Sequence, residues 1–300
     1  MRKAILVLLT VFLVGMAAFS ADGAGTTGAP FLKIPVGAKA GALGDAVVAA
    51  PFGAEAIFWN LGSLGFQKGI HFNASYQDWI ADANTQYVGL TYNLDGIGTF
   101  GLGLVNLGFG EDMLRTTLAD PDGTAGEEFS AGDMALTLAY GRKITDSIGI
   151  GVGGKYVSQK IDTETATAFT ADIGIRAKFM DNICVGLSVQ NLFGEIGYTE
   201  TFKFPMILRF GLAYKVMDGI TGFGQVDYHM ESGVKFSVGA EYVLADMIAL
   251  RIGYKGNTDN EGLTAGVGVK YEFIDIDFSY GIGTEEALSN VMKFSLGLHF

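Results

Sequence analysis

The chain has 300 residues, a formal net charge of −12, 49% hydrophobic residues and a single cysteine, Cys184. An acidic chain is a poor match for nucleic acid, whose phosphates require basic surface, and one cysteine cannot form an intramolecular disulfide. Nucleic acid is therefore not expected as a partner, and stability must come from packing and backbone pairing.

Residues 1–20 have the pattern of an export signal. Arg2 and Lys3 precede an apolar run, and small residues occupy the −3 and −1 positions of a cleavage site before Ala21. An uncleaved membrane anchor is the alternative, but the run is at the short end of the roughly 20 residues that a helical span needs. We predict a signal peptide over 1–20, and no later apolar run suggests a helical span.

The next segment is unlike the rest of the chain. Gly41–Gly65 is rich in glycine, almost uncharged, and has neither a helical nor a strand periodicity. It precedes a long series of predicted strands, and its role is inferred below from the fold that those strands form.

From residue 69 onward, apolar residues alternate with small or polar ones, which is the period of a β-strand. The last segment shows it best, with Met292, Phe294 and Leu296 on one face and Lys293, Ser295 and Gly297 on the other. Fourteen such strands are predicted, at 69–79, 83–94, 97–109, 130–143, 147–160, 167–179, 182–193, 204–216, 219–229, 233–244, 247–256, 261–272, 274–283 and 290–300.

The connections between these strands alternate in length. Those after even-numbered strands are short and carry an aspartate, a residue that favours turns, whereas those after odd-numbered strands include the long segments 110–129 and 194–203. An even strand number with this sorting of connections is typical of bacterial outer-membrane barrels. In hydrocarbon every backbone amide must be paired, so the sheet must close, with 69–79 beside 290–300.

The predicted fold is therefore all-β, a transmembrane antiparallel β-barrel over 67–300 in the outer membrane of a Gram-negative-type bacterium. An aromatic residue ends nearly every strand, as expected for girdles at the two bilayer interfaces. The inward face carries glycine, alanine, serine and scattered charge. Its basic residues either line a path or form lumen salt bridges with Glu241 and Asp277; they are Lys155, Arg209, Lys215, Arg251 and Lys270.

In this context residues 21–66 are predicted to be an N-terminal extension and hatch inside the barrel. Four short stretches of this region, Phe31–Lys33, Gly37–Lys39, Leu43–Ala46 and Trp59–Leu64, resemble the N-terminal signature of the PorV/PorQ group, which is related to FadL-type transporters. The resemblance implies a fourteen-stranded barrel with an N-terminal hatch. Leu61 stands where that group usually has proline, so the rigid turn that proline provides is missing.

The hatch and ligand-path candidates are Phe52, Phe58, Trp59 and Asn60. The indole of Trp59 would fill the lumen, and the amide of Asn60 would bond hatch backbone or barrel wall; a purely structural latch is the alternative. Phe300, the terminal aromatic residue, resembles the outer-membrane assembly signal, which implies the barrel assembly machinery as a partner.

Several motifs argue against other functions. The three histidines lie far apart without metal-ligand spacing, and His71, Ser75 and Asp78 do not share one strand face, so neither a metal site nor an enzyme is predicted. Gly149–Gly154 matches a nucleotide fingerprint but continues as a strand. The acidic segment 111–128 could bind calcium, but its irregular spacing favours a solvated loop, and no cofactor is expected.

Two functions of different classes fit these observations. The FadL resemblance implies passage of hydrophobic small molecules, and an apolar pocket near the hatch would suit it. The PorV resemblance implies a barrel associated with type IX secretion that binds exported protein cargo. A structural outer-membrane protein without transport is a third possibility.

Overall fold

The computed structural model describes residues 23, 25–79, 83–109, 113–114, 116, 120–121, 126, 128–258, 261–283 and 290–300. Within these ranges, no helix has the length and apolar character needed to cross a membrane. The predicted signal peptide, and most of the acidic segment 111–128, lie outside the described residues.

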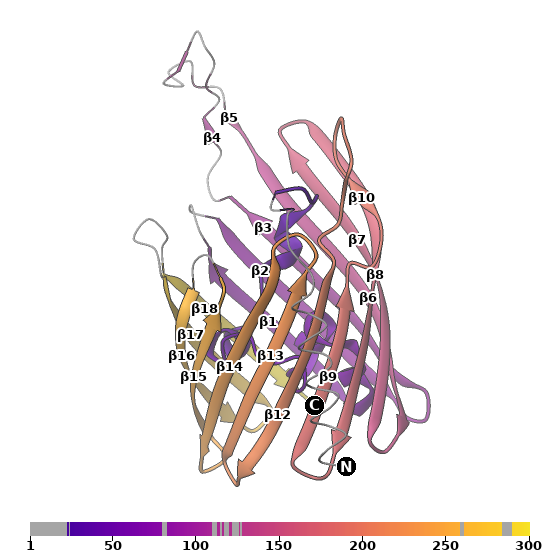
Figure 1. The fold of residues 1–300 in the computed structure, drawn as a ribbon, viewed down its shortest axis with the longest axis vertical. Helices are drawn as coiled ribbons and strands as arrows, with labels where there is room; N and C mark the ends of the chain where they lie inside the picture. The colour runs from indigo at the N-terminus through magenta and orange to yellow at the C-terminus, as the bar shows by residue number, and fades with distance from the viewer. Residues whose placement is uncertain are drawn as a thin grey trace.

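Fourteen antiparallel strands form a closed barrel, which confirms the predicted fold class (Figure 1). The strands are β1 (Ile70–Asp78), β2 (Asn84–Leu94), β3 (Gly98–Gly108), β6 (Ala131–Thr145), β7 (Ile148–Ile161), β8 (Glu164–Phe179), β9 (Ile183–Gln190), β12 (Ile207–Met217), β13 (Ile220–His229), β14 (Gly233–Leu244), β15 (Ile248–Gly256), β16 (Glu261–Tyr271), β17 (Ile274–Gly283) and β18 (Val291–His299). Each strand pairs with its neighbours along the barrel, and β1 pairs with β18 to close it.

Two short hairpins are inserted in the long connections. β4 (Met113–Leu114) pairs with β5 (Glu128–Phe129), and β10 (Glu195–Ile196) pairs with β11 (Phe202–Lys203). Both hairpins lie at the same end of the barrel, which we call the long-connection end. The opposite end, where β1 begins and β18 leads to Phe300, is called the short-turn end.

The predicted strand bounds differ from the observed ones on both sides of the connection 191–206, and by as much at the start of β8. The sequence predicted a strand to residue 193, but β9 ends at Gln190. Asn191 has a φ of 55°, its amide donates to Asp172 Oδ1 at 2.8 Å, and its side chain donates to the carbonyl of Pro205 at 2.9 Å. Asn tolerates this left-handed conformation, so the chain leaves the wall here.

Alternation along the strands separates an apolar outer face from a mixed inner face. On β15, Ile248, Leu250 and Ile252 are exposed on the outside, while Arg251 is buried inside. Most of the strand-end aromatics also lie on the outer face; Tyr92, Tyr214, Tyr242, Tyr254 and Tyr271 are exposed. The barrel therefore presents apolar and aromatic side chains outward along its height.

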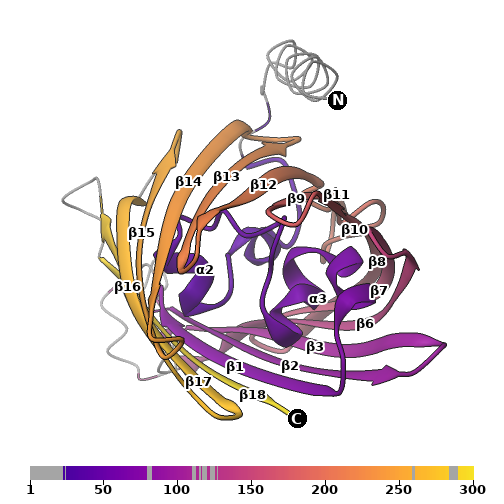
Figure 2. The ribbon, with the colours of Figure 1, turned by 90° about the horizontal axis from the view of Figure 1, so that it is seen from below.

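The N-terminal segment lies inside the ring of strands (Figure 2). It contains η1 (Pro30–Lys33), α2 (Ala38–Ala42), η2 (Gly53–Glu55), α3 (Ala56–Trp59) and η3 (Leu61–Phe66). Helices of one turn are too short to produce a detectable helical periodicity, which explains why the sequence showed none. We call residues 37–66 the plug and residues 28–36 the strap.

Inward-facing glycines of the wall allow the plug backbone to approach it closely. A Cβ atom on Gly151 would stand 2.3 Å from the carbonyl oxygen of Leu61, and one on Gly186 would stand 2.2 Å from that of Val48. We call these wall glycines the glycine belt; it comprises Gly101, Gly141, Gly151, Gly174, Gly186, Gly211, Gly239, Gly253 and Gly266, one on each of nine strands. The abundance of small inward residues is thus explained by the close fit of the plug.

Candidate functional site

Trp59 and Asn60 lie at the centre of the plug. Trp59 ends α3, is 1% exposed, and donates from Nε1 to the carbonyl of Val36 at 3.1 Å. The amide of Asn60 donates to the carbonyl of Val48 at 2.8 Å and to that of Ile175 on β8 at 3.0 Å. Trp59 therefore joins the plug to the strap, and Asn60 joins the plug to the wall.

Asn60 also organises the turn at Leu61, where the resemblance to the PorV/PorQ group implied a proline. Its Oδ1 accepts from the amide of Gly62 at 3.0 Å and caps η3. An asparagine side chain that bonds the backbone two residues ahead mimics a turn. The local conformation is thus held by a side-chain bond instead of a proline ring.

The two phenylalanine candidates have different surroundings. Phe58 packs edge-on against Trp59, with ring centroids 5.2 Å apart, and near the guanidinium of Arg209. Phe52 is 39% exposed and contacts the Lys39 ammonium instead. The structure therefore groups Phe58 with Trp59 but not Phe52.

Three of the five predicted lumen charges are buried in ion pairs. Lys155 pairs with Asp172 at 2.9 Å, and Arg209 pairs with Asp227 at 3.3 Å. Arg251 places Nε 2.7 Å from Glu241 and Nη1 2.6 Å from Asp277. Burial of a charge is tolerated where it is paired in this way.

The other two, Lys215 and Lys270, do not line the interior. Both are exposed at the short-turn end, and Lys215 pairs with Asp218 across the adjacent turn at 2.7 Å. Alternation along a strand shows the face on which a residue lies but not its height along the barrel axis. Lys215 and Lys270 lie on the inward face, but so close to the short turns that they are in solvent at the mouth of the barrel, past the end of the plug.

A second set of buried charges belongs to the plug and escaped sequence analysis. Lys39 in α2 pairs with Glu241 at 2.9 Å, so it joins the Arg251 network. Asp45 pairs with Lys255 at 2.5 Å and lies 3.8 Å from Lys293. Lys255 and Lys293 could be found from their inward parity, but nothing in the sequence around Asp45 indicates that a wall cation faces it.

A cavity of about 610 Å³ lies above the plug at the long-connection end. Trp59 and Asp45 belong to its lining. The side formed by the strap and strands β1 to β6 is largely apolar, with Phe31, Ile34, Trp79, Leu107 and Phe109 beside the charged Lys33 and Asp133. The side formed by β12 to β15 and their connections carries Arg209, Asp227, His229, Glu231, Lys235 and Lys255. The cavity therefore offers an apolar surface facing a charged one.

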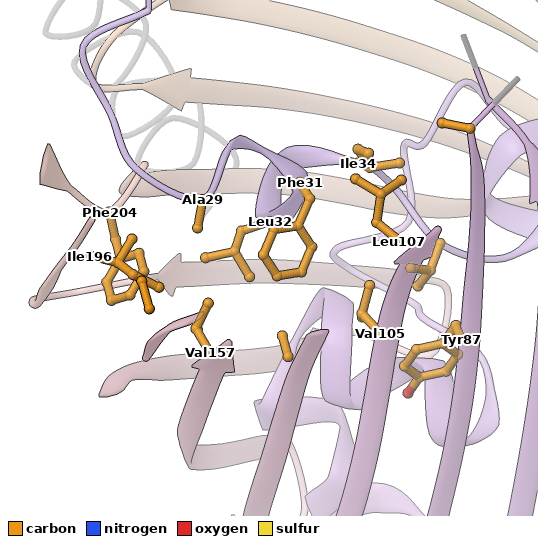
Figure 3. Packing of buried hydrophobic residues seen from close by; sticks show 14 residues of the cluster. Ala29, Phe31, Leu32, Ile34, Tyr87, Val105, Leu107, Val157, Ile196 and Phe204 are labelled. Atoms are coloured by element: carbon orange, nitrogen blue, oxygen red, sulfur yellow. The ribbon is translucent and has the colours of Figure 1, made fainter. Parts of the chain in front are cut away.

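The strap covers a further apolar part of the wall. Phe31 and Leu32 are 2% and 4% exposed, and they pack in a cluster with aliphatic and aromatic residues of the wall and of the connection between β9 and β12 (Figure 3). The wall and connection residues of this cluster include Tyr87, Val105, Leu107, Ala135, Val157, Ile196 and Phe204.

Polar contacts hold the strap near the rim. Lys33 forms an ion pair with Glu231, which also accepts a hydrogen bond from Thr27. The amide of Gly28 donates to the carbonyl of Lys203 at 2.9 Å. Burial alone would raise the pKa of the Glu231 carboxyl, but the bonds from Lys33 and Thr27 lower it below its usual value.

Phe300 lies at the closure of the barrel. Its amide and carbonyl both bond Ile70 at 2.9 Å, and its exposed ring stacks on Phe273 with centroids 5.2 Å apart. The terminal residue thus extends the pairing of β18 with β1, while its side chain is available at the surface.

No family model matches the chain, and no curated protein sequence matches it. Among solved structures, it is similar to the toluene transporter TodX of Pseudomonas putida, with a TM-score of 0.66 and 13% identity over 88% of this chain and 98% of that one. The CymD monoaromatic hydrocarbon channel gives 0.63 and 12% over 88% and 97%, and a FadL homologue of Pseudomonas aeruginosa gives 0.59 and 12% over 88% and 98%. At these identities the similarity establishes a common fold.

Proposed function

We propose that this protein is an outer-membrane channel for hydrophobic small molecules. The observation that carries the proposal is the 610 Å³ cavity above the plug, whose apolar side continues beneath the strap. Ligand sites are concave and mostly apolar with a few polar groups. The proteins that share the fold include a toluene transporter and a monoaromatic hydrocarbon channel, which supports the same class of ligand.

The outer surface supports the membrane location. A closed barrel leaves no unpaired strand edge, and apolar residues face outward on its strands. With the short turns on the periplasmic side, the cavity would open toward the exterior. The exposed ring of Phe300 would then be part of the signal read by the barrel assembly machinery.

The route would begin in the cavity and pass along the apolar side beneath the strap. Trp59 lines the cavity as well, and the Arg209–Asp227 pair faces the apolar side from across it. Because the glycine belt holds the plug against the wall, the strap is the part whose displacement would extend the route.

The chain offers a direct assay of this proposal. It has two tryptophans, Trp59 and Trp79, and both line the cavity. Tryptophan emission of the purified folded barrel, excited at a wavelength that tyrosine does not absorb, therefore reports on the cavity. Toluene and a long-chain fatty acid should each change the emission in a saturable way, and glucose should leave it unchanged.

Two variants separate cavity binding from general effects. Leu107→Ser places a hydroxyl on the apolar side and should weaken toluene binding about tenfold, because replacing a buried leucine removes roughly 1–2 kcal/mol of apolar contact. Ser237→Ala, on the other side of the same cavity, should bind as the parent does. No saturable change with either ligand, together with unchanged uptake by cells that carry the barrel, would refute the channel function.

Membership of the PorV/PorQ group and a role in type IX secretion form the alternative. It is supported by the residues Trp59–Leu64, which the resemblance singled out and which form the centre of the plug. Purification from outer membranes followed by mass spectrometry separates the functions: a stoichiometric hydrophobic molecule supports the channel, and exported proteins or secretion subunits support the alternative. Recovery of the barrel from that membrane with neither would favour a structural role.

A further inference from the structure

Closure of the barrel brings two of the three histidines together. His71 on β1 and His299 on β18 are directly opposite each other across the closing pair of strands. Their rings stack with centroids 6.3 Å apart and planes 20° apart. In the sequence these residues stand near opposite ends of the strand series, so spacing along the chain conceals the pair.

The strand pairing places the two side chains as close as a sheet allows. Ile70 and Phe300 exchange both of their backbone hydrogen bonds, each of 2.9 Å. The next pair inward, His71 with His299, is therefore a pair without hydrogen bonds between its own backbones. In such pairs the Cα atoms approach to about 4.5 Å and the side chains are closest.

Each imidazole has one nitrogen next to an oxygen acceptor. His71 Nε2 lies 3.0 Å from the carbonyl of Lys68, and His299 Nδ1 lies 3.4 Å from Asp275 Oδ2. The hydrogen bond to Lys68 holds the proton of the neutral His71 ring on Nε2, and the nearby Asp275 carboxylate favours the proton of His299 on Nδ1, so the lone pair lies on the other nitrogen of each ring. This arrangement presents Nδ1 of His71 and Nε2 of His299 as ligands.

We propose that His71 and His299 form a two-imidazole binding site for a divalent late transition-metal ion, with Asp275 positioning His299 and water completing the coordination. Imidazole suits Zn²⁺, Cu²⁺ and Ni²⁺. Metal–nitrogen distances of about 2.0–2.1 Å require both rings to turn toward a common point. The rings are at the short-turn end, where His71 is half-buried and His299 is 31% exposed, so both rings have room to turn.

The proposal adds a site on the first and last strands, away from the cavity above the plug. Among the described residues, no group of three His, Cys, Asp or Glu side chains is placed so that it could hold a metal ion. The site therefore depends on the histidine pair, and a bound ion would join β1 to β18 at the point where the barrel closes.

The test uses the full-length folded barrel without a polyhistidine tag. Cu²⁺ is titrated by calorimetry, and the bound ion is examined by electron paramagnetic resonance for coupling to two nitrogens. The parent should bind one equivalent with a two-nitrogen signature. His71→Gln and His299→Gln should each weaken binding at least tenfold and leave a one-nitrogen signature, and Asp275→Asn should weaken binding a few-fold with both nitrogens retained.

Two controls keep the result interpretable. Heat-modifiable migration in gels verifies that each variant has closed into a barrel, and Lys68→Ala retains the backbone carbonyl and should bind as the parent does. A two-nitrogen signature that persists in the double variant, or folded parent protein that binds no Cu²⁺, would overturn the proposal.

Discussion

The plug and the strap belong to one run of chain inside the barrel, yet the wall holds them by different means. Wall side chains bond the plug backbone, as Gln225 does at Val48 (2.9 Å) and Arg176 at Ala49 (2.9 Å), and the glycine belt allows close backbone contact. The strap is held mainly by side-chain packing and by the Lys33–Glu231 pair near the rim. Its backbone is bonded near its two ends, by the carbonyl of Lys203 at Gly28 (2.9 Å) and by Lys293 at Pro35 (3.4 Å). Close backbone contact with many strands fixes the plug, whereas a segment with few backbone bonds can detach more readily.

The largest effect is expected where a side chain is added to the glycine belt. Gly151→Val would place Cβ 2.3 Å from the carbonyl oxygen of Leu61, and a backbone atom held on several sides cannot yield. We expect a loss of more than about 3 kcal/mol of stability, measured by denaturant unfolding in detergent. Gly154→Val on the same strand is the matched control, because a Cβ there meets nothing within 4 Å; equal losses in both variants would show that the plug is not fixed by the belt.

The next effect tests whether the strap detaches alone. Phe31→Ala removes the main buried ring of the strap and should lower the free energy of unfolding by about 3 kcal/mol. Amide exchange should become faster in the strap and stay unchanged in the plug. Phe202→Ala, which removes an exposed ring on β11, should change neither. Plug exchange that accelerates together with the strap would mean that the two form one unit.

A smaller effect is expected at the joint between them. Trp59→Phe keeps most of the buried ring but loses the 3.1 Å bond from Nε1 to the carbonyl of Val36. The expected loss is about 1 kcal/mol, seen as faster exchange at residues near Val36. Tyr140→Phe removes a bond of the same kind, 2.7 Å from the hydroxyl to the carbonyl of Ile97 on the outer wall, and it should leave that exchange unchanged.

The smallest effect concerns pH. The lowered pKa of Glu231 means that its tether to Lys33 stabilises the strap above the carboxyl's usual pKa of 4.5 and is lost as the pH falls through the lowered value. Loss of the tether should cost about 0.5–1 kcal/mol. Amide exchange of the strap, corrected for intrinsic rates, should rise as the pH falls below 4.5 in the parent but show no such step in Glu231→Gln.

The sequence predicted the wall much better than its contents. Period-two alternation is strong in strands with one apolar face, so the fourteen strands and their closure could be predicted to within a few residues for most ends. The interior has no such regularity. The pairing of Asp45 with Lys255, or of His71 with His299, depends on which distant residues the closed ring brings together.

Depth within the barrel was the second quantity that the sequence could not provide. Lys215 and Arg209 have the same parity on β12, yet Arg209 is buried beside Trp59 and Lys215 is exposed. Their difference arises from the height of the plug relative to the strand. The aromatic and amide at Trp59 and Asn60 were identifiable because a tryptophan and an asparagine stand out in a segment of small residues.

The bonds between the plug and the two strands that close the barrel bear on the order in which the barrel assembles. The amide of Ala38 donates to Ser295 on the last strand at 2.7 Å, and that of Ala54 donates to Asn73 on the first strand at 2.6 Å. The two strands that seal the ring are therefore both lined by the segment that the ring encloses. We therefore expect the N-terminal segment to be in place before β1 pairs with β18, so that the barrel closes around it.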